Sequence, residues 1–163
     1  MAVARGDRRR FAIVRARFNA PITQALLDGA LEALVDAKID RRDVEIVEVP
    51  GAFELPLAAA WLARSKRFAG VVALGCVIRG ETPHFEYVAG AASRGLADVM
   101  LETGVPVGFG VLTTENEAQA RARSGKVRRG TGAHVGASRH GNKGYEAAQA
   151  VLEMASLAAR LRK

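Results

Sequence analysis

Four short runs of apolar, mostly β-branched residues stand out along the chain, and each predicts a β-strand. They lie at residues 11–14, 44–49, 70–76 and 105–112. The third run is apolar at nearly every position, which is typical of a strand buried on both faces of a parallel sheet. The segments between and after these runs have a different, helical spacing of apolar residues.

The helical spacing is clearest between Ile22 and Ala37, where apolar residues share one face and Pro21 fits the first turn. We predict further helices at about residues 54–66, 84–103 and 142–161. After the fourth apolar run, Thr114-Glu-Asn-Glu117 has the pattern of a capping box and predicts that a short helix begins there.

Strand and helix alternate four times, which predicts an α/β fold with a parallel sheet. We expect a three-layer sandwich in which a four-stranded parallel sheet is flanked by helices on both faces. The 163 residues show neither an internal repeat nor an interdomain linker, so we expect one domain over residues 1–163. We also predict that residues 1–10 are flexible and that the Gly-rich, basic residues 124–141 form a long loop.

Composition narrows the class of protein. Hydrophobic residues make up 49% of the chain, as in a folded globular protein rather than a disordered one. The longest apolar run, residues 70–78, is too short to cross a membrane, and the charged N-terminus does not resemble a secretory signal. The single cysteine, Cys76, excludes an intramolecular disulfide, so we expect a cytoplasmic protein without a membrane partner.

Much of the basic charge behind the net charge of +7 lies in two segments, residues 5–10 and 121–143. Solvated faces explain most of it, and one or two cations could serve an anionic small substrate. Nucleic-acid binding is a third interpretation, but no aromatic residue lies between Ser124 and His140 to stack on bases. His134 and His140 have no carboxylate or cysteine at ligand spacing, so we expect no metal site there.

Candidate chemistry gathers where the four predicted strands end, because ligands of open parallel sheets bind at the carboxyl ends of the strands. The four ends read Arg15-Ala-Arg-Phe-Asn19, Pro50-Gly-Ala-Phe-Glu54, Val77-Ile-Arg-Gly-Glu-Thr-Pro-His84 and Phe109-Gly-Val-Leu-Thr-Thr-Glu-Asn116. In the third, a histidine on the first turn of a helix follows an Arg-Gly-Glu-Thr turn. Such a segment can hold an anion beside a group that moves protons.

Each of these residues also has a purely structural explanation. Phe18 and Phe53 are equally compatible with the core, and Glu54 could interact with the dipole at a helix N-terminus. Cys76 fits a small buried hydrophobic residue, because nothing close in the sequence would activate its thiol.

Taken together, the motifs resemble the lumazine synthase family, the enzymes of the penultimate step of riboflavin biosynthesis. The matching segments run in family order over nearly the whole chain: Arg17-Phe-Asn19, Val49-Pro-Gly-Ala-Phe-Glu54, Gly75-Cys-Val-Ile-Arg-Gly-Glu-Thr-Pro-His84 with Tyr87-Val88, Gly104-Val-Pro-Val107, Phe109-Gly-Val-Leu-Thr-Thr-Glu-Asn116 and Asn142-Lys-Gly144. The block that ends in His84 is the most specific of them.

The resemblance implies a flavodoxin-like fold and assembly into pentamers, some of which pack into sixty-subunit shells. It implies condensation of 5-amino-6-(D-ribitylamino)uracil with 3,4-dihydroxy-2-butanone 4-phosphate to 6,7-dimethyl-8-ribityllumazine, phosphate and water, without metal or organic cofactor. The active sites would lie between neighbouring subunits. Riboflavin synthase would be a pathway partner.

The resemblance also assigns roles in the part of the site that binds the aminouracil. Phe18 would stack on the pyrimidine ring. The other residues would line the site for the ring and its ribityl chain or hold the pyrimidine edge, largely through backbone groups: Ala52, Phe53, Glu54, Cys76, Val77 and Ile78.

In the phosphate part of the site, Glu81 and Thr82 would bind the second substrate chiefly through backbone N–H groups at a helix start. Arg123 would complete this part. The residues between Arg123 and Asn142 are more numerous than the family's short link, so other arginines are alternatives for the phosphate: Arg121, Arg128 and Arg129.

Three further residues receive roles from the resemblance. His84 would shuttle protons, Lys143 would assist as a cation, and Phe109 would reach into the neighbouring subunit's site. An insertion at residues 124–141 would obstruct close packing of pentamers, so we expect a free pentamer or a pair of pentamers rather than a shell. A related protein that binds flavins or lumazines without catalysis is the remaining alternative.

Overall fold

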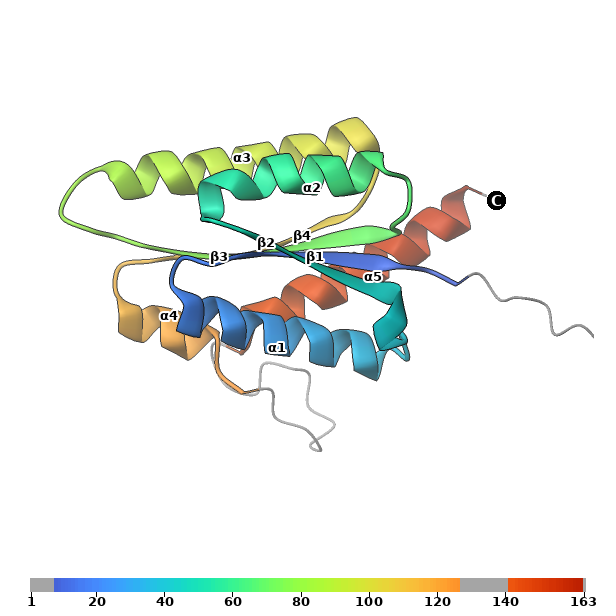
Figure 1. The fold of residues 1–163 in the computed structure, drawn as a ribbon, viewed down its shortest axis with the longest axis horizontal. Helices are drawn as coiled ribbons and strands as arrows, with labels where there is room; N and C mark the ends of the chain where they lie inside the picture. The colour runs from blue at the N-terminus through green and yellow to red at the C-terminus, as the bar shows by residue number, and fades with distance from the viewer. Residues whose placement is uncertain (1–7, 127–140, 163) are drawn as a thin grey trace, which may run out of the picture.

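The computed structural model describes residues 8–126 and 141–162 and has the expected three layers (Figure 1). Four parallel strands form the central sheet in the order β2-β1-β3-β4. They are β1 (Phe11–Ala16), β2 (Val44–Val49), β3 (Gly70–Ile78) and β4 (Val107–Thr114). The α/β fold with a four-stranded parallel sheet is therefore confirmed.

Five helices cover the two faces of the sheet. They are α1 (Ala20–Asp36), α2 (Leu55–Arg64), α3 (His84–Thr103), α4 (Glu117–Arg123) and α5 (Lys143–Leu161). Helices α2 and α3 lie on one face, and α1, α4 and α5 lie on the other (Figure 1). Two short 3-10 turns, η1 (Arg41–Asp43) and η2 (Ala52–Glu54), flank β2.

Alternation along the two central strands divides the core into two apolar clusters, one on each face of the sheet. Phe11, Ile13 and Leu74 pack with residues of α1 and α5, whereas Ala12 and Val14 pack with α2 and α3. All of these residues are fully buried. This burial on both faces explains why the third apolar run is nearly continuous. The carboxyl ends of all four strands lie at one edge because every pair is parallel.

Helix α4 begins later than the capping-box pattern predicted. Thr114 is the last residue of β4, and its pairing with β3 keeps it extended. The N-cap is Asn116, whose side chain accepts a hydrogen bond from the Gln119 N–H at 2.9 Å. The Gln119 side chain accepts from the Glu115 N–H at 2.9 Å. The predicted short helix is confirmed, but its cap lies two residues beyond Thr114.

The chain before and after the predicted loop is tied together at its base. Ser124 and Asn142 form an antiparallel β-bridge. Asn142 is buried, and its amide donates to the carbonyl oxygens of Ala25 at 3.1 Å and Gly125 at 2.8 Å while its oxygen accepts from the Tyr145 N–H at 3.0 Å. One side chain therefore joins α1, the end of α4 and the start of α5.

Close contact between α1 and α5 explains a glycine beside this junction. A side-chain carbon at Gly144 would overlap the carbonyl oxygen of Leu26 in α1. The two helix backbones can approach this closely only because position 144 has no side chain. The start of α5, including Lys143, is thereby held against α1.

Part of two sequence predictions lies outside the described residues. These are the flexibility predicted for residues 1–7 and the loop conformation predicted for residues 127–140, with His134, His140, Arg128 and Arg129. Of the remaining N-terminal residues, Arg8 donates to Asp43 at 2.8 Å and Arg9 donates to Ser156 at 3.0 Å.

We predict that Asn142→Ala lowers the free energy of unfolding by about 2–4 kcal/mol, because two partly buried carbonyls and one buried helix N–H lose their partner. The exposed cap variant Asn116→Ala is the matched control and should cost about 1 kcal/mol. Urea unfolding at a fixed protein concentration measures both. Equal midpoints for the two variants would contradict the role of Asn142 as the junction.

Candidate functional site

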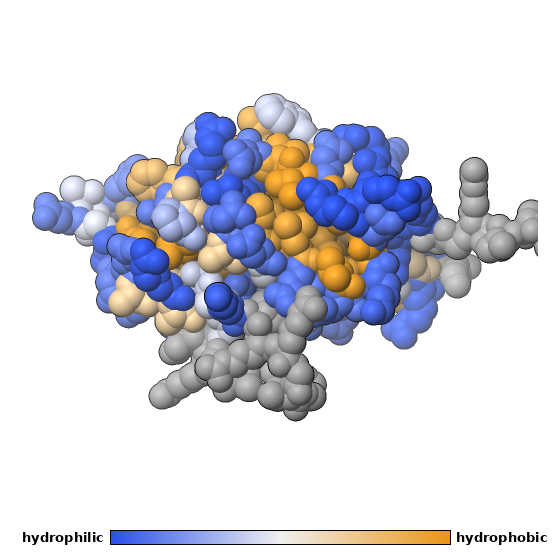
Figure 2. All heavy atoms as spheres, turned by 60° about the horizontal axis from the view of Figure 1, so that its bottom comes forward, coloured by the Kyte–Doolittle hydropathy of each residue, from blue (hydrophilic) through white to orange (hydrophobic). Residues whose placement is uncertain are grey.

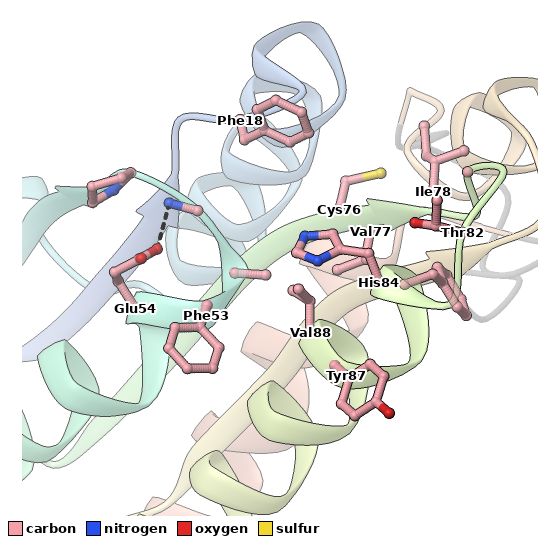
Figure 3. A pocket seen from close by; sticks show the side chains of 15 residues that line it. Phe18, Phe53, Glu54, Cys76, Val77, Ile78, Thr82, His84, Tyr87 and Val88 are labelled. Carbon is pink, nitrogen blue, oxygen red and sulfur yellow. Dashed lines mark hydrogen bonds between the residues drawn. The ribbon is translucent and has the colours of Figure 1, made fainter.

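A pocket of about 730 Å³ opens at the carboxyl edge of the sheet (Figure 3). Its walls come from the β1–α1 turn, from the segment after β2 with η2, from the end of β3, and from the loop and first turns of α3. Nine residues singled out from the sequence line it together: Phe18, Ala52, Phe53, Glu54, Cys76, Val77, Ile78, Thr82 and His84.

The end of β3 forms the floor of this pocket because β3 is longer than β1 at this edge. Pairing of β3 with β1 ends at Leu74, whereas pairing with β4 continues to Ile78. Residues 75–78 therefore have no strand partner on the side of β1. Backbone groups of a strand without a neighbouring strand are strong donors and acceptors, and here they face the pocket.

Asn19 fixes the turn that carries Phe18. Its backbone is left-handed with φ 59°, a conformation that asparagine tolerates better than most residues. Its side-chain amide donates to the Cys76 carbonyl at 2.9 Å, and the Phe18 N–H donates to the Pro50 carbonyl at 3.0 Å. The turn is thus tied to two other walls of the pocket.

The two phenylalanines that the sequence left open between core and site are exposed rather than buried. Phe18 is 71% exposed and Phe53 is 63% exposed, so neither belongs to the core. Both line the pocket from opposite elements, the β1–α1 turn and η2. Exposed rings on a concave surface are typical of sites that bind planar ligands by stacking.

Glu54 is the last residue of η2, the 3-10 turn that follows β2. Its carboxylate accepts a hydrogen bond from the Gly51 N–H at 2.9 Å, which is the dashed line in Figure 3. Glu54 is also the residue before the first turn of α2, where a negative charge interacts favourably with the helix dipole. It therefore shapes the pocket wall and keeps a carboxylate within it.

Cys76 lies at the pocket but is not a nucleophile. Burial, with a smaller contribution from the charge of Glu117, raises the pKa of its thiol to about 11. The thiol is consequently protonated at neutral pH, and only the thiolate is a strong nucleophile. The structure therefore favours the first explanation for this side chain, a small buried hydrophobic residue.

His84 is the first residue of α3, and its imidazole points into the pocket in Figure 3. The side chain is exposed, and it shares the pocket with Thr82, Cys76 and Val88. The first N–H groups of α3 have no side-chain cap, because the preceding residue is Pro83. An anion bound by these N–H groups would therefore lie next to the imidazole.

Comparisons with known proteins identify the family of this chain. The sequence profile of 6,7-dimethyl-8-ribityllumazine synthase matches residues 8–159. The chain belongs to this family.

Three curated members illustrate the similarity, each a 6,7-dimethyl-8-ribityllumazine synthase. The protein of Nitratidesulfovibrio vulgaris is 49% identical over 144 residues, 88% of this chain and 85% of the relative. That of Syntrophus aciditrophicus is 48% identical over 148 residues, which are 91% of this chain and 88% of the relative. That of Desulfotalea psychrophila is 49% identical over 153 residues, which are 94% of this chain and 91% of the relative.

Four residues assigned from the resemblance to lumazine synthases do not line the pocket. Glu81 is exposed in the loop beside Thr82, and Phe109 is 48% exposed on β4. Arg123 donates to the Gln119 carbonyl at 3.0 Å at the end of α4. Lys143 lies 2.6 Å from the Glu146 carboxylate at the start of α5.

The last two of these, Arg123 and Lys143, are nevertheless brought together. Arg123 precedes Ser124 and Lys143 follows Asn142, and these two residues form the antiparallel bridge, so both cations lie beside it. The length of the segment between them does not change this relation. The structure thus forms one group of pocket residues and a second group of two cations on the opposite helical layer.

Six residues that line the pocket of this lumazine synthase family member are outside the predicted site, although all but Phe85 stand in a motif matched to the family: Pro50, Gly51, Gly80, Phe85, Tyr87 and Val88. Helical spacing could have found two of them, because positions 87 and 88 lie three and four residues after His84 on the same face of α3. Pro50 and Gly51 were within a matched motif, but their backbone contribution leaves no chemical signal in the sequence.

The described part of the chain, residues 8–126 and 141–162, contains no group of three or more His, Cys, Asp or Glu residues that could hold a metal ion. Within the same residues, no helix combines the length and the apolar character that crossing a bilayer requires.

Proposed function

We propose that this protein condenses 5-amino-6-(D-ribitylamino)uracil with 3,4-dihydroxy-2-butanone 4-phosphate. The products are 6,7-dimethyl-8-ribityllumazine, phosphate and water, and the reaction is the penultimate step of riboflavin biosynthesis. The observation that carries the proposal is the pocket in which an exposed aromatic ring, an unpaired strand edge and a histidine beside a helix N-terminus meet. Membership of the family supports it.

The aminouracil suits the part of the pocket between Phe18 and the end of β3. Phe18 offers an exposed ring face for stacking on the pyrimidine. The backbone edge of residues 76–78 offers donors and acceptors to the polar edge of the ring. Glu54 can accept hydrogen bonds from ribityl hydroxyls, and Ala52 and Phe53 bound the same wall.

The phosphate of the second substrate suits the N-terminus of α3. Backbone N–H groups near Glu81, Thr82 and His84 provide donors, and the helix dipole favours an anion there. The exposed carboxylate of Glu81 can turn to solvent, so it does not oppose the phosphate. Loss of phosphate and water from the condensing substrates needs proton transfers, which His84 performs from the same end of the pocket.

A cation from a second copy completes this phosphate site. No lysine or arginine is among the described residues that line the pocket, although a departing phosphate is best stabilised by charge-assisted hydrogen bonds. Arg123 and Lys143 lie beside the same bridge but on the other helical layer. We therefore assign them, together with Phe109, to the pocket of a neighbouring subunit.

Exposed apolar surface supports such self-association. Phe53, Leu57 and Trp61 follow one another at intervals of four along η2 and α2, and they are 63%, 55% and 66% exposed. Figure 2 shows a band of apolar side chains across the face of the molecule that it presents. Contiguous apolar surface of this kind marks protein interfaces.

We infer a homo-oligomer that is a pentamer or a pair of pentamers in preference to a sixty-subunit shell. The segment between Ser124 and Asn142 is longer than the short family link at which pentamers meet. The free thiol of Cys76 agrees with a cytoplasmic enzyme, with riboflavin synthase acting next in the pathway.

We predict that His84→Ala lowers kcat about 10- to 100-fold without abolishing turnover. This loss is smaller than is typical for removal of a general acid–base, because both substrates are intrinsically reactive. Product absorbance with both substrates present measures the rate. Wild-type kcat in the variant would remove His84 from proton transfer. No turnover by the unmodified protein, with binding of lumazines retained, would favour the non-catalytic alternative.

We predict that Arg123→Ala raises the KM for the phosphate-bearing substrate about 10-fold or more and changes the KM for the aminouracil little. Arg121→Ala is the matched control, since Arg121 lies on the same helix but is paired with Glu117. A larger effect at Arg121 would transfer the role to it. Mixing the two impaired variants His84→Ala and Arg123→Ala tests whether the cation comes from a neighbour. If it does, random assembly gives about one quarter of the sites both wild-type residues, and the activity at low substrate concentration rises above that of either variant; if it does not, no site regains both residues.

We predict a particle of five or ten 17.3-kDa chains in light scattering, and a particle of about a megadalton would contradict it. Trp61→Arg should shift the distribution to smaller particles because a charge replaces an apolar contact, whereas Trp61→Phe should not. Trp61 is the only tryptophan, so its fluorescence reports the same contact on dilution.

A further inference from the structure

The segment that carries the phosphate donors and His84 has little internal support. Residues 79–83 form an irregular connection between β3 and α3, and most of it is exposed. Helix α3 begins without a side-chain cap. Around Gly80 there is open space, since an added side-chain carbon would meet no atom within 4 Å. Local packing therefore does not fix the position of this connection relative to the pocket, and another contact must do so.

We propose that Arg79 is the positioning residue of this segment, an inference that rests on the proposed function of the pocket. Its backbone N–H extends the sheet by donating to the Thr114 carbonyl at 2.8 Å. Its side chain then reaches in two directions, to Glu115 after β4 at 2.8 Å and to Glu86 in the first turn of α3 at 3.3 Å. One guanidinium therefore joins the end of the sheet to the helix that carries His84.

The same guanidinium also packs on an aromatic ring of the pocket wall. Its central carbon lies 4.5 Å from the centre of the Phe85 ring, and Phe85 lines the pocket next to His84. A planar guanidinium can stack on a ring and donate to two carboxylates at once, whereas an ammonium group cannot reproduce this geometry. The contact fixes the rotation of the first turn of α3 as well as its distance from the sheet.

Arg79 does not serve as the phosphate ligand in this arrangement. It is outside the set of residues that line the pocket, and two carboxylates already accept its hydrogen bonds. Its side chain is 37% exposed and those of Glu86 and Glu115 are more exposed still. Exposed ion pairs contribute little to global stability, but small displacements of a catalytic group reduce the rate strongly. Arg79 therefore affects turnover more than folding.

The experiment compares Arg79→Ala, Arg79→Lys, Glu115→Gln and the double variant Arg79→Ala/Glu115→Gln with Arg64→Ala. Arg64 is the control because it also forms an exposed ion pair with a residue of α3, Glu102 at 3.3 Å, away from the pocket. We expect kcat to fall about 10-fold in Arg79→Ala, with both KM values within about twofold and the urea midpoint unchanged. Arg79→Lys should not restore kcat, and the double variant should resemble Arg79→Ala.

A second readout does not depend on turnover. Hydrogen–deuterium exchange should rise in Arg79→Ala for a peptide that covers residues 79–88 and should remain unchanged in Arg64→Ala. Wild-type kcat and wild-type exchange in Arg79→Ala would overturn the proposal. A raised KM for the phosphate-bearing substrate with unchanged kcat would also overturn it, by making Arg79 a phosphate ligand. Inactivity of the unmodified protein would defeat the proposed function, while the exchange result would still decide the role of Arg79.

Discussion

The site depends on a difference in length between neighbouring strands at the carboxyl edge of the sheet. β3 pairs with β4 up to Ile78 but with β1 only up to Leu74, so its last residues present backbone groups that the sheet does not use. Such groups need partners, which favours polar ligands. The Asn19 amide satisfies one of them, the Cys76 carbonyl, and in doing so sets the position of Phe18. A ring to stack on and an edge to bind therefore arise from one difference in strand length.

In the proposed function, the groups that bind the aminouracil and the groups that act on the phosphate-bearing substrate lie on parts of the fold that are held in place differently. The groups that we assign to the pyrimidine belong to strands and to turns tied to them, which are held by pairing on at least one side. The groups that we assign to phosphate and proton transfer lie on an uncapped helix start, which the side chain of Arg79 joins to the end of the sheet. A site built this way can hold one substrate rigidly while the reacting end adjusts as bonds form and break.

The sequence predicted the regular parts of this fold because their signals are local. The second strand and α3 have the same bounds in the structure as in the pattern, since hydrophobic spacing determines both. The strand predicted at residues 70–76 stopped two residues short of the end of β3, although the apolar run continues to Ile78, where pairing with β4 ends. The cap at Asn116 was missed because the same pairing keeps Thr114 extended.

The candidate site was predictable as a set of strand ends but not as a geometry. The strand-end rule and the resemblance together named Phe18, Glu54 and His84, yet neither could tell exposed rings from buried ones. The placement of Arg123 and Lys143 beside one bridge was hidden by the eighteen residues between Arg123 and Asn142, because a bridge between distant segments leaves no periodic signal. Spatial proximity across an insertion is information that only the folded chain contains.

The bridge between Ser124 and Asn142 has a practical consequence. Its two sides are anchored independently, by the end of α4 and by the buried amide of Asn142 against α1. The entropic cost of closing a loop grows only slowly with its length. The stretch between the two anchors is therefore a natural place to graft an affinity tag, a fluorescent reporter or a foreign epitope. In a ring of subunits, each graft would be displayed once per protomer at a symmetric set of positions.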